Sequence, residues 1–374
     1  MEQETRTVVF LGAGFSKAIT AKTARPLPLS AEVLSNPYWV DALSYEDLQA
    51  DLSISLPGRG ALEDVLCLDF ACDMQVRPDR GFGQWVLRGT TTAVNFENVY
   101  AHCLLHSTSP YLSVAAQNLN RTALLLLQVL VSRALDATRC GGTPDLALLN
   151  SFIAYARGAQ SPSAPSRVAY FTTNFDNLIE TAHQFDPTAQ YRLSHGLSLE
   201  AAGMRGTGEI DAVLCGTSAW DHGPSYRKLH GSISYFTCSN PDCPLSLSFH
   251  SHANVRLFER SCPECGGFVY PGIVPPTTMK DYRSSKYSLR FVSGVYTALR
   301  AATRVIIVGY SFPAHDSVLN SRIFNGIKDG TGIREIAIID KFSSGRIAAR
   351  LRGIAADDCE ISTYRDLVEL PTPQ

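Results

Sequence analysis

The stretch "VVFLGAGFSKA", residues 8–18, places four apolar residues directly before Gly-Ala-Gly and a segment compatible with a helix. A buried strand that ends in glycines predicts a tight turn, because glycine adopts backbone angles closed to other residues. Gly12 and Gly14 would also let a phosphate approach the backbone, and Ser16 would add a hydroxyl donor. The pattern therefore predicts either a nucleotide-binding turn or a plain tight turn. It is neither a complete GxGxxG nor a P-loop, which argues against a kinase or an ATPase.

Further strand patterns return only after residue 166. "RVAYFTTNFD", "YRKLHGSISYF", "DAVLCG", "TRVIIVGYSF" and "IREIAIIDKF" all contain strand candidates, and the last clear strand ends at Asp340. Several are continuous apolar runs, which are typical of a parallel sheet covered on both faces. The predicted fold class is α/β, a Rossmann-like parallel sheet with a large helical insertion and a small zinc-binding module.

Helical patterns fill the region between the first glycine turn and residue 166. They include "ALEDVLCLDFACDM", "ENVYAHCLLHS" and the leucine-rich Thr122–Leu135, and the linker "ARGAQSPSAPS" follows them. We expect a Rossmann-like nucleotide-binding domain from residues 1–24 and 166–374. The helical insertion would occupy residues 25–165, and the zinc module residues 238–270.

The sequence argues against a stand-alone nucleic-acid binder and against a membrane protein. The chain has 374 residues, of which 33 are basic and 35 acidic, so it lacks the charge of a stand-alone nucleic-acid binder. The leucine-rich helix is interrupted by Gln128 and is too short to span a bilayer. "MEQETRTVVF" does not read as a signal peptide, and we expect a cytosolic protein without membrane contact.

Polar residues follow the strand predicted at residues 167–172. Thr172, Asn174 and Asp176 would stand at the carboxyl end of a strand, which is the edge where open α/β sheets bind ligands. Capping of the next helix by Asn174 or Asp176 is the alternative, although it accounts for one polar residue and not for the run. His230, in "KLHGSIS", suits proton transfer near neutral pH, but a lone histidine is more often structural.

Two cysteine pairs form the strongest local pattern. Cys238 and Cys243 form a C-x4-C pair, and after eighteen further residues Cys262 and Cys265 form a C-x2-C pair. Four thiolates suit tetrahedral Zn²⁺, and a site filled by protein ligands would be structural. A redox-active CxxC pair is the alternative, which the second pair nearby disfavours.

Taken in order, these motifs resemble the sirtuin family. The matching positions are Gly12, Ala13, Gly14, Ser16, Thr172, Asn174, Asp176, His230, Gly231, the two cysteine pairs, Gly309, Ser311 and Asp340. The resemblance covers about residues 6–18 and 167–345 and leaves out the helical insertion.

The resemblance implies that NAD⁺ is a substrate whose nicotinamide–ribose bond is cleaved. It implies catalytic roles for Asn174, which would position the attacking water, His230, a general base toward a ribose hydroxyl, and Asp176, at the nicotinamide carboxamide. It implies NAD⁺ binding by Gly12, Ala13, Gly14, Phe15, Ser16, Thr172, Gly309, Ser311 and Asp340. The pyridinium leaves readily, so the protein would mainly orient it and stabilise an oxocarbenium-like state.

Three departures set the chain apart from protein-deacylase sirtuins. "KAITAKTARPLPLS" stands where they carry a Gly-Ile-Pro-Asp-Phe-Arg type of segment, Thr173 replaces a glutamine, and "YPGIVPPTTMKDY" only loosely resembles their peptide-pairing segment. The large insertion resembles instead the sirtuin-like NAD⁺ hydrolases of bacterial anti-phage defence systems, in which water attacks and NAD⁺ is depleted.

Relatives of this size act with a separate partner, either a HerA-type hexameric ATPase or a short Argonaute-like protein. We favour the ATPase and expect a homo-oligomer, with the helical insertion as the assembly surface. An NAD⁺-dependent deacylase and a non-catalytic NAD⁺ or ADP-ribose sensor are the alternative functions.

Overall fold

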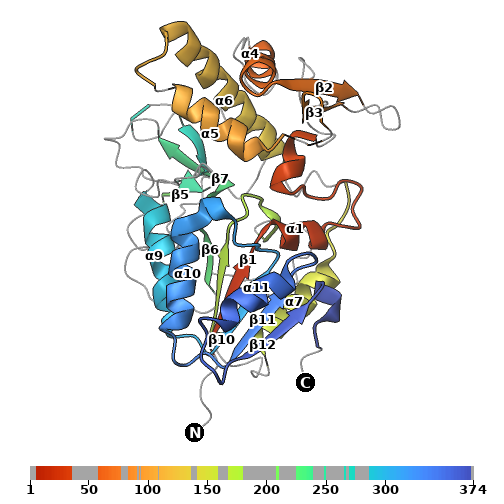
Figure 1. The fold of residues 1–374 in the computed structure, drawn as a ribbon, viewed down its shortest axis with the longest axis vertical. Helices are drawn as coiled ribbons and strands as arrows, with labels where there is room; N and C mark the ends of the chain where they lie inside the picture. Colours follow the sequence, from red (N-terminus) through yellow and green to blue (C-terminus); the bar gives the residue numbers. More distant parts are fainter. Residues whose placement is uncertain are drawn as a thin grey trace.

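The computed structural model describes residues 6–35, 58–76, 83–90, 92, 94–107, 109–135, 141–158, 167–179, 208–209, 225–238, 248–249, 265–266, 269–273 and 286–371. At its centre lies a six-stranded sheet in the order β12-β11-β10-β1-β4-β6, with every neighbouring pair parallel (Figure 1). Its strands are β1 (Thr7–Leu11), β4 (Val168–Thr172), β6 (Ser225–Lys228), β10 (Arg304–Val308), β11 (Glu335–Ile339) and β12 (Glu360–Tyr364).

The strand order is that of doubly wound nucleotide-binding sheets. Numbered along the chain, the six strands run 3-2-1-4-5-6 across the sheet. The direction of winding reverses between β1 and β10, so the topological switch point lies there. Side chains of β1 and β4 are buried throughout, as expected for strands covered on both faces.

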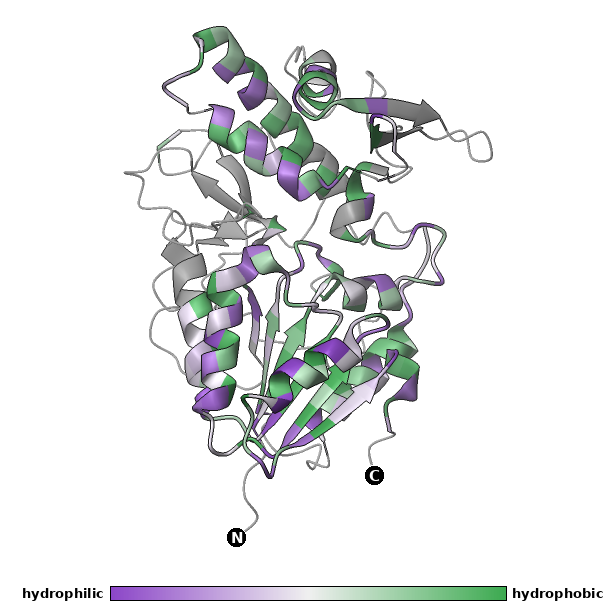
Figure 2. Cartoon of the chain, in the orientation of Figure 1, coloured by the Kyte–Doolittle hydropathy of each residue, from purple (hydrophilic) through white to green (hydrophobic). Residues whose placement is uncertain are grey.

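Helices cover the two faces of the sheet. On one face, α1 (Ala13–Ile19) and α7 (Leu146–Arg157) pack on side chains such as Val9 and Tyr170. On the other face, α9 (Lys286–Arg300), α10 (Ser317–Lys328) and α11 (Ser344–Arg352) pack on Val8 and Phe10. Figure 2 shows the central strands as mainly hydrophobic, whereas the helices around them also carry polar residues.

A second unit, which we call the helical unit, lies beyond the carboxyl edge of the sheet (Figure 1). It contains η1 (Ser30–Ser35), α4 (Gly58–Asp64), the π-helical turn η2 (Val65–Asp69), β2 (Cys72–Val76), β3 (Gly83–Leu87), α5 (Phe96–Ser107) and α6 (Val114–Ala134). Residues such as Leu62, Val99 and Leu127 give this unit a core of its own.

A smaller antiparallel sheet lies beside the helical unit. Its order is β5-β8-β7-β9, from β5 (Gly208–Glu209), β7 (Gly231–Cys238), β8 (Ser248–Phe249) and β9 (Val269–Ile273). Two short 3-10 helices complete the described elements, η5 (Ala314–Asp316) and η6 (Leu367–Glu369).

The predicted α/β class, the Rossmann-like parallel sheet and the helical insertion are confirmed. Two details of the sequence analysis are wrong. The strand ending before Asp340 is not the last, because β12 follows as a half-exposed edge strand with too few apolar residues to stand out. The helical pattern over residues 61–74 ends at Asp69, because Ala71 has a φ of +46° and β2 then pairs with β3.

No helix in the described part of the chain has the length and apolar character needed to cross a bilayer. The predicted linker at residues 156–166 begins inside α7, which ends at Arg157. Its residues 159–166 and the strand candidate at residues 211–216 lie outside the described residues.

Candidate active site

Two glycine turns meet at the switch point of the sheet. Gly12 follows β1 and Gly309 follows β10, and a Cβ atom added to Gly12 would lie 2.2 Å from the carbonyl oxygen of Gly309. A Cβ atom on Gly309 would lie 2.6 Å from Cα of Gly14, and Gly309 has a φ of +59°. Only glycine fits such close backbone approach. The glycines therefore let the two turns pack closely against each other at the switch point.

Asn174 joins the end of β4 to the glycine turn. Its Nδ2 atom donates to the carbonyl oxygen of Gly12 and to Oγ of Ser16, both at 2.9 Å. Thr172 supports this arrangement, because its hydroxyl donates to the carbonyl oxygen of Leu11 and accepts from the backbone N–H of Asn174, both at 3.0 Å. The predicted residues Gly12, Ser16, Thr172 and Asn174 thus lie together.

The carbonyl oxygen of the Asn174 side chain, Oδ1, is buried and lacks a hydrogen-bond partner among the described residues. The side chain is 6% exposed, and within the described part of the chain no group hydrogen-bonds to its Oδ1 atom. An unpaired buried carbonyl oxygen costs about 1–3 kcal/mol, so native proteins seldom keep one without a ligand or a water molecule. A bound polar group that donates a hydrogen bond to this oxygen would remove that cost.

Asp176 and Lys228 are buried next to this region. Oδ1 of Asp176 accepts a hydrogen bond from the backbone N–H of Leu178 at 3.0 Å, a local turn contact. The ammonium group of Lys228, on β6, donates to the carbonyl oxygen of Asp176 and to Oγ of Ser232, the latter at 2.9 Å. Lys228 is 0% exposed, and a buried charge requires such partners. Sequence reasoning missed Lys228, which holds the segment that carries Asp176.

His230 lies between β6 and β7 beside a buried carboxylate. Its Nε2 atom is 3.4 Å from Oδ1 of Asp316, and the two side chains are 4% and 2% exposed. The ring of Phe175 lies 6.1 Å from the imidazole, between centroids. A carboxylate in this position can orient the imidazole, as in a base held by a third group.

Asp316 is the main functional candidate that sequence reasoning missed. It directly precedes α10 and so reads as an ordinary helix cap, yet its side chain makes no capping hydrogen bond. The hydroxyl of Tyr310 lies 3.0 Å from Oδ2 of Asp316 and 2.9 Å from Oδ1 of Asn320. Nearby Phe312 has a φ of +56°, which is rare for a bulky residue and typical of strained functional segments.

The remaining predicted NAD⁺-binding residues lie partly at the surface and partly in the core. Ala13 is partly exposed at the start of α1, and Ser311 is exposed after β10. Phe15 is 1% exposed and packs on Phe152, with ring centroids 5.2 Å apart, so its side chain belongs to the core. Asp340 follows β11 and lies at the same carboxyl edge of the sheet as Gly309.

Asp340 also has a capping function. Its Oδ1 atom accepts hydrogen bonds from the backbone N–H groups of Phe342 and Ser343, at 2.9 and 2.5 Å. This contact fixes the turn before α11. The role in ribose recognition that the motif resemblance implies for Asp340 stays a prediction.

The helical unit reaches this site through α5. Oε2 of Glu97 lies 3.1 Å from Nε2 of His315, and Glu97 is 8% exposed. His315 directly precedes Asp316 in η5. The loop that carries Asp316 is thus held between α10 and the helical unit.

The structure does not confirm the zinc-binding module. Cys238 ends β7, and Cys265 is exposed in a turn shortly before β9. Because β7 and β9 pair antiparallel, with Cys238 opposite Val269, the two cysteines come from the same end of the smaller sheet. Cys243 and Cys262 lie outside the described residues, so the four-thiolate site stays a prediction.

Neither a family model nor a curated protein matches this chain by sequence. Among solved structures, it is similar to a Sir2 variant with a deacetylated p53 peptide and 3'-O-acetyl ADP ribose, at 12% identity and a TM-score of 0.38, over 97% of this chain and 89% of that chain. It is also similar to Sir2Tm bound to a propionylated peptide, at 12% identity and a TM-score of 0.33 over the same shares of the two chains.

Proposed function

We propose that this chain is an NAD⁺ glycohydrolase, which uses water to cleave NAD⁺ into nicotinamide, ADP-ribose and one proton. The observation that carries the proposal is the position of Asn174. One end of its amide holds the glycine turn at the switch point, and its Oδ1 atom is buried without a partner among the described residues. A water molecule that donates a hydrogen bond to this oxygen would satisfy it and be oriented for attack.

The neighbouring residues have complementary roles in this proposal. The backbone of the turn at Gly12 and Gly14 would accept the diphosphate of NAD⁺ where α1 begins. His230, oriented by Asp316, would take a proton from a ribose hydroxyl, and the ribose oxygen that becomes negative would support the positive charge that develops on the ribose. Asp176 would bind the nicotinamide carboxamide. The electron pair of the broken bond leaves with nicotinamide, and the oxygen of water forms the new bond to the ribose.

The test is product identification with purified full-length protein and NAD⁺. Nicotinamide and free ADP-ribose released without any peptide would support the glycohydrolase. Release that requires an acylated peptide would identify a deacylase instead, and tight binding of NAD⁺ without turnover would identify a sensor. His230→Ala and Asn174→Ala are expected to abolish release, and normal release by both would contradict the site.

The proposal extends to anti-phage defence by NAD⁺ depletion, through a homo-oligomer assembled with a HerA-type ATPase. It rests on the motif resemblance and on exposed apolar side chains of the helical unit, Leu68, Leu105, Tyr111 and Val114. Gel filtration with and without a candidate ATPase tests this part separately. A strictly monomeric protein that does not bind the ATPase would refute it and leave the glycohydrolase proposal standing.

A further inference from the structure

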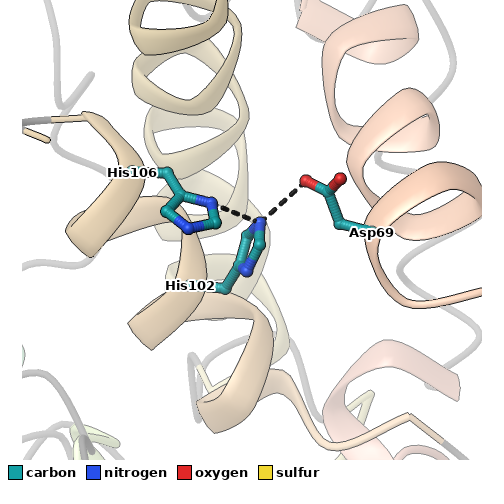
Figure 3. A group of neighbouring side chains, drawn as sticks. All are labelled: Asp69, His102 and His106. Carbon is teal, nitrogen blue, oxygen red and sulfur yellow. Dashed lines mark hydrogen bonds and ion pairs between the residues drawn. The ribbon is translucent and has the colours of Figure 1, made fainter. Parts of the chain in front are cut away.

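A cluster of three side chains on the helical unit lies outside the candidate active site. His102 and His106 are one turn apart on α5 and therefore share a face of that helix. Asp69, at the end of the π-helical turn η2, faces them (Figure 3). Nε2 of His102 lies 2.7 Å from Oδ2 of Asp69 and 2.8 Å from Nδ1 of His106.

One two-centre hydrogen bond does not account for both short distances. Nε2 of His102 carries either a proton or a lone pair, but not both. If it donates to ionised Asp69, it has no lone pair left for His106. If it accepts from His106, its lone pair faces the lone pairs of the Asp69 carboxylate at 2.7 Å. A metal ion that binds a lone pair from each of the three residues would remove this conflict.

The surroundings hold the three groups in place and leave them accessible. The ring of Phe70 packs edge-on against His102, with centroids 5.0 Å apart. The side chains of His102 and Asp69 are 21% and 39% exposed, so an ion has a path from solvent. The three ligand atoms all lie within 4.8 Å of one another.

We propose that Asp69, His102 and His106 form a binding site for a divalent transition-metal ion such as Zn²⁺. Two imidazoles and one carboxylate are a ligand set that such ions prefer, whereas Mg²⁺ and Ca²⁺ prefer oxygen ligands alone. Three protein ligands leave a coordination position for water, unlike the closed site predicted for the cysteines. The ion would join α5 to η2, the turn that follows α4, and so stabilise the helical unit.

The experiment compares metal binding by full-length variants. Metal-stripped wild-type protein is titrated with Zn²⁺ by calorimetry, and its bound metal is measured by elemental analysis. The wild type is expected to bind about one ion per chain more than the His102→Gln, His106→Gln double variant. Asp69→Asn is expected to weaken this site about tenfold or more, since even outer-shell partners contribute that much. Asp73→Asn, an exposed carboxylate paired with Arg88, is the matched control and should bind like the wild type.

A Co²⁺ titration separates this site from the cysteines. Co²⁺ bound to thiolates shows sulfur-to-metal charge-transfer absorption, whereas Co²⁺ bound by nitrogen and oxygen does not. The ion lost in the double variant is expected to lack that absorption. Equal metal content and affinity in wild type and double variant would overturn the proposal. Should the double variant misfold by circular dichroism, Asp69→Asn decides alone, and unchanged affinity in that variant would overturn the proposal as well.

Discussion

The imidazole of His230 and the carboxylate of Asp316 lie 3.4 Å apart, and both are almost fully buried. The two residues come from different crossovers of the sheet, one after β6 and one after β10. Nε2 of His230 is turned toward Asp316, so the carboxylate is placed to orient the proposed base.

Asp316→Asn is expected to lower kcat for nicotinamide release by up to about 10⁴-fold, the loss seen when the carboxylate behind a catalytic histidine becomes an amide. KM for NAD⁺ should change little, because Asp316 contacts the histidine and not the substrate in the proposed arrangement. Steady-state kinetics measure both. Asp316→Glu should recover part of the rate, and Asp329→Asn, an exposed carboxylate after α10, is the control. A wild-type kcat for Asp316→Asn would remove Asp316 from the mechanism.

Asn174→Ala removes two hydrogen bonds to the glycine turn together with the unpaired oxygen. Each lost bond costs about 0.5–1.5 kcal/mol of stability, but loss of the unpaired oxygen offsets part of this cost. We therefore expect a modest fall in stability and a complete loss of turnover. Asn120→Ala is the matched control, since it also removes a buried amide whose Nδ2 atom donates to a backbone carbonyl oxygen and whose Oδ1 atom has no partner among the described residues, but on α6. Urea unfolding and nicotinamide release separate the two effects; a variant that loses stability and keeps turnover would contradict the prediction.

Gly309→Ala should destabilise the fold and weaken NAD⁺ binding together. The left-handed φ alone costs about 1–2 kcal/mol for a residue with a Cβ atom, and that atom would also overlap the backbone of Gly14. Gly345→Ala is the control, because its Cβ atom on α11 meets nothing within 4 Å and alanine favours helix. Denaturation midpoints and calorimetric titration with NAD⁺ measure the two effects. Equal midpoints for the two variants would contradict the close contact.

The four-cysteine prediction has its own test. Cys262→Ser should remove about one thiolate-bound Zn²⁺ per chain and lower the thermal midpoint. Exposed Cys265 should react with an alkylating reagent only after a chelator has removed the metal. Full labelling of Cys265 in gently purified protein without chelator would exclude zinc at this position.

The buried thiol of Cys72 predicts a pH dependence of stability. Burial, followed by the nearby Cys67 and Asp73, raises the pKa of Cys72 from its ordinary 9.0 to about 11. Unfolding therefore favours the thiolate, so this contribution to stability is present below pH 9.0 and is lost as pH rises toward 11. The difference in unfolding free energy between wild type and Cys72→Ala should shrink across this window. A constant difference would show that Cys72 does not titrate in this way.

The sheet was more predictable than the site, for a physical reason. Runs such as residues 8–11 and 305–308 are apolar throughout because both faces are covered, and such runs stand out in any sequence. β12 does not stand out, because an edge strand alternates with polar residues. Asn174 could be found because a strand end marks a ligand-binding edge.

Asp316 and Lys228 could not be found in this way. Before a helix, an aspartate is indistinguishable from a cap, and on a strand a lysine reads as solvent-exposed. The Asp69, His102 and His106 cluster was missed because its carboxylate comes from a π-helical turn, which brings residues distant in sequence opposite α5. These positions depend on tertiary contacts, which local patterns do not record.

The central place of β1 has a consequence for synthesis. Its residues 7–11 pair on one side with 168–172 and on the other with 304–308. During translation the first strand therefore leaves the ribosome long before its second neighbour, and one of its edges stays open until most of the chain has been made. Such late pairing slows folding and leaves an unpaired strand edge exposed in the meantime.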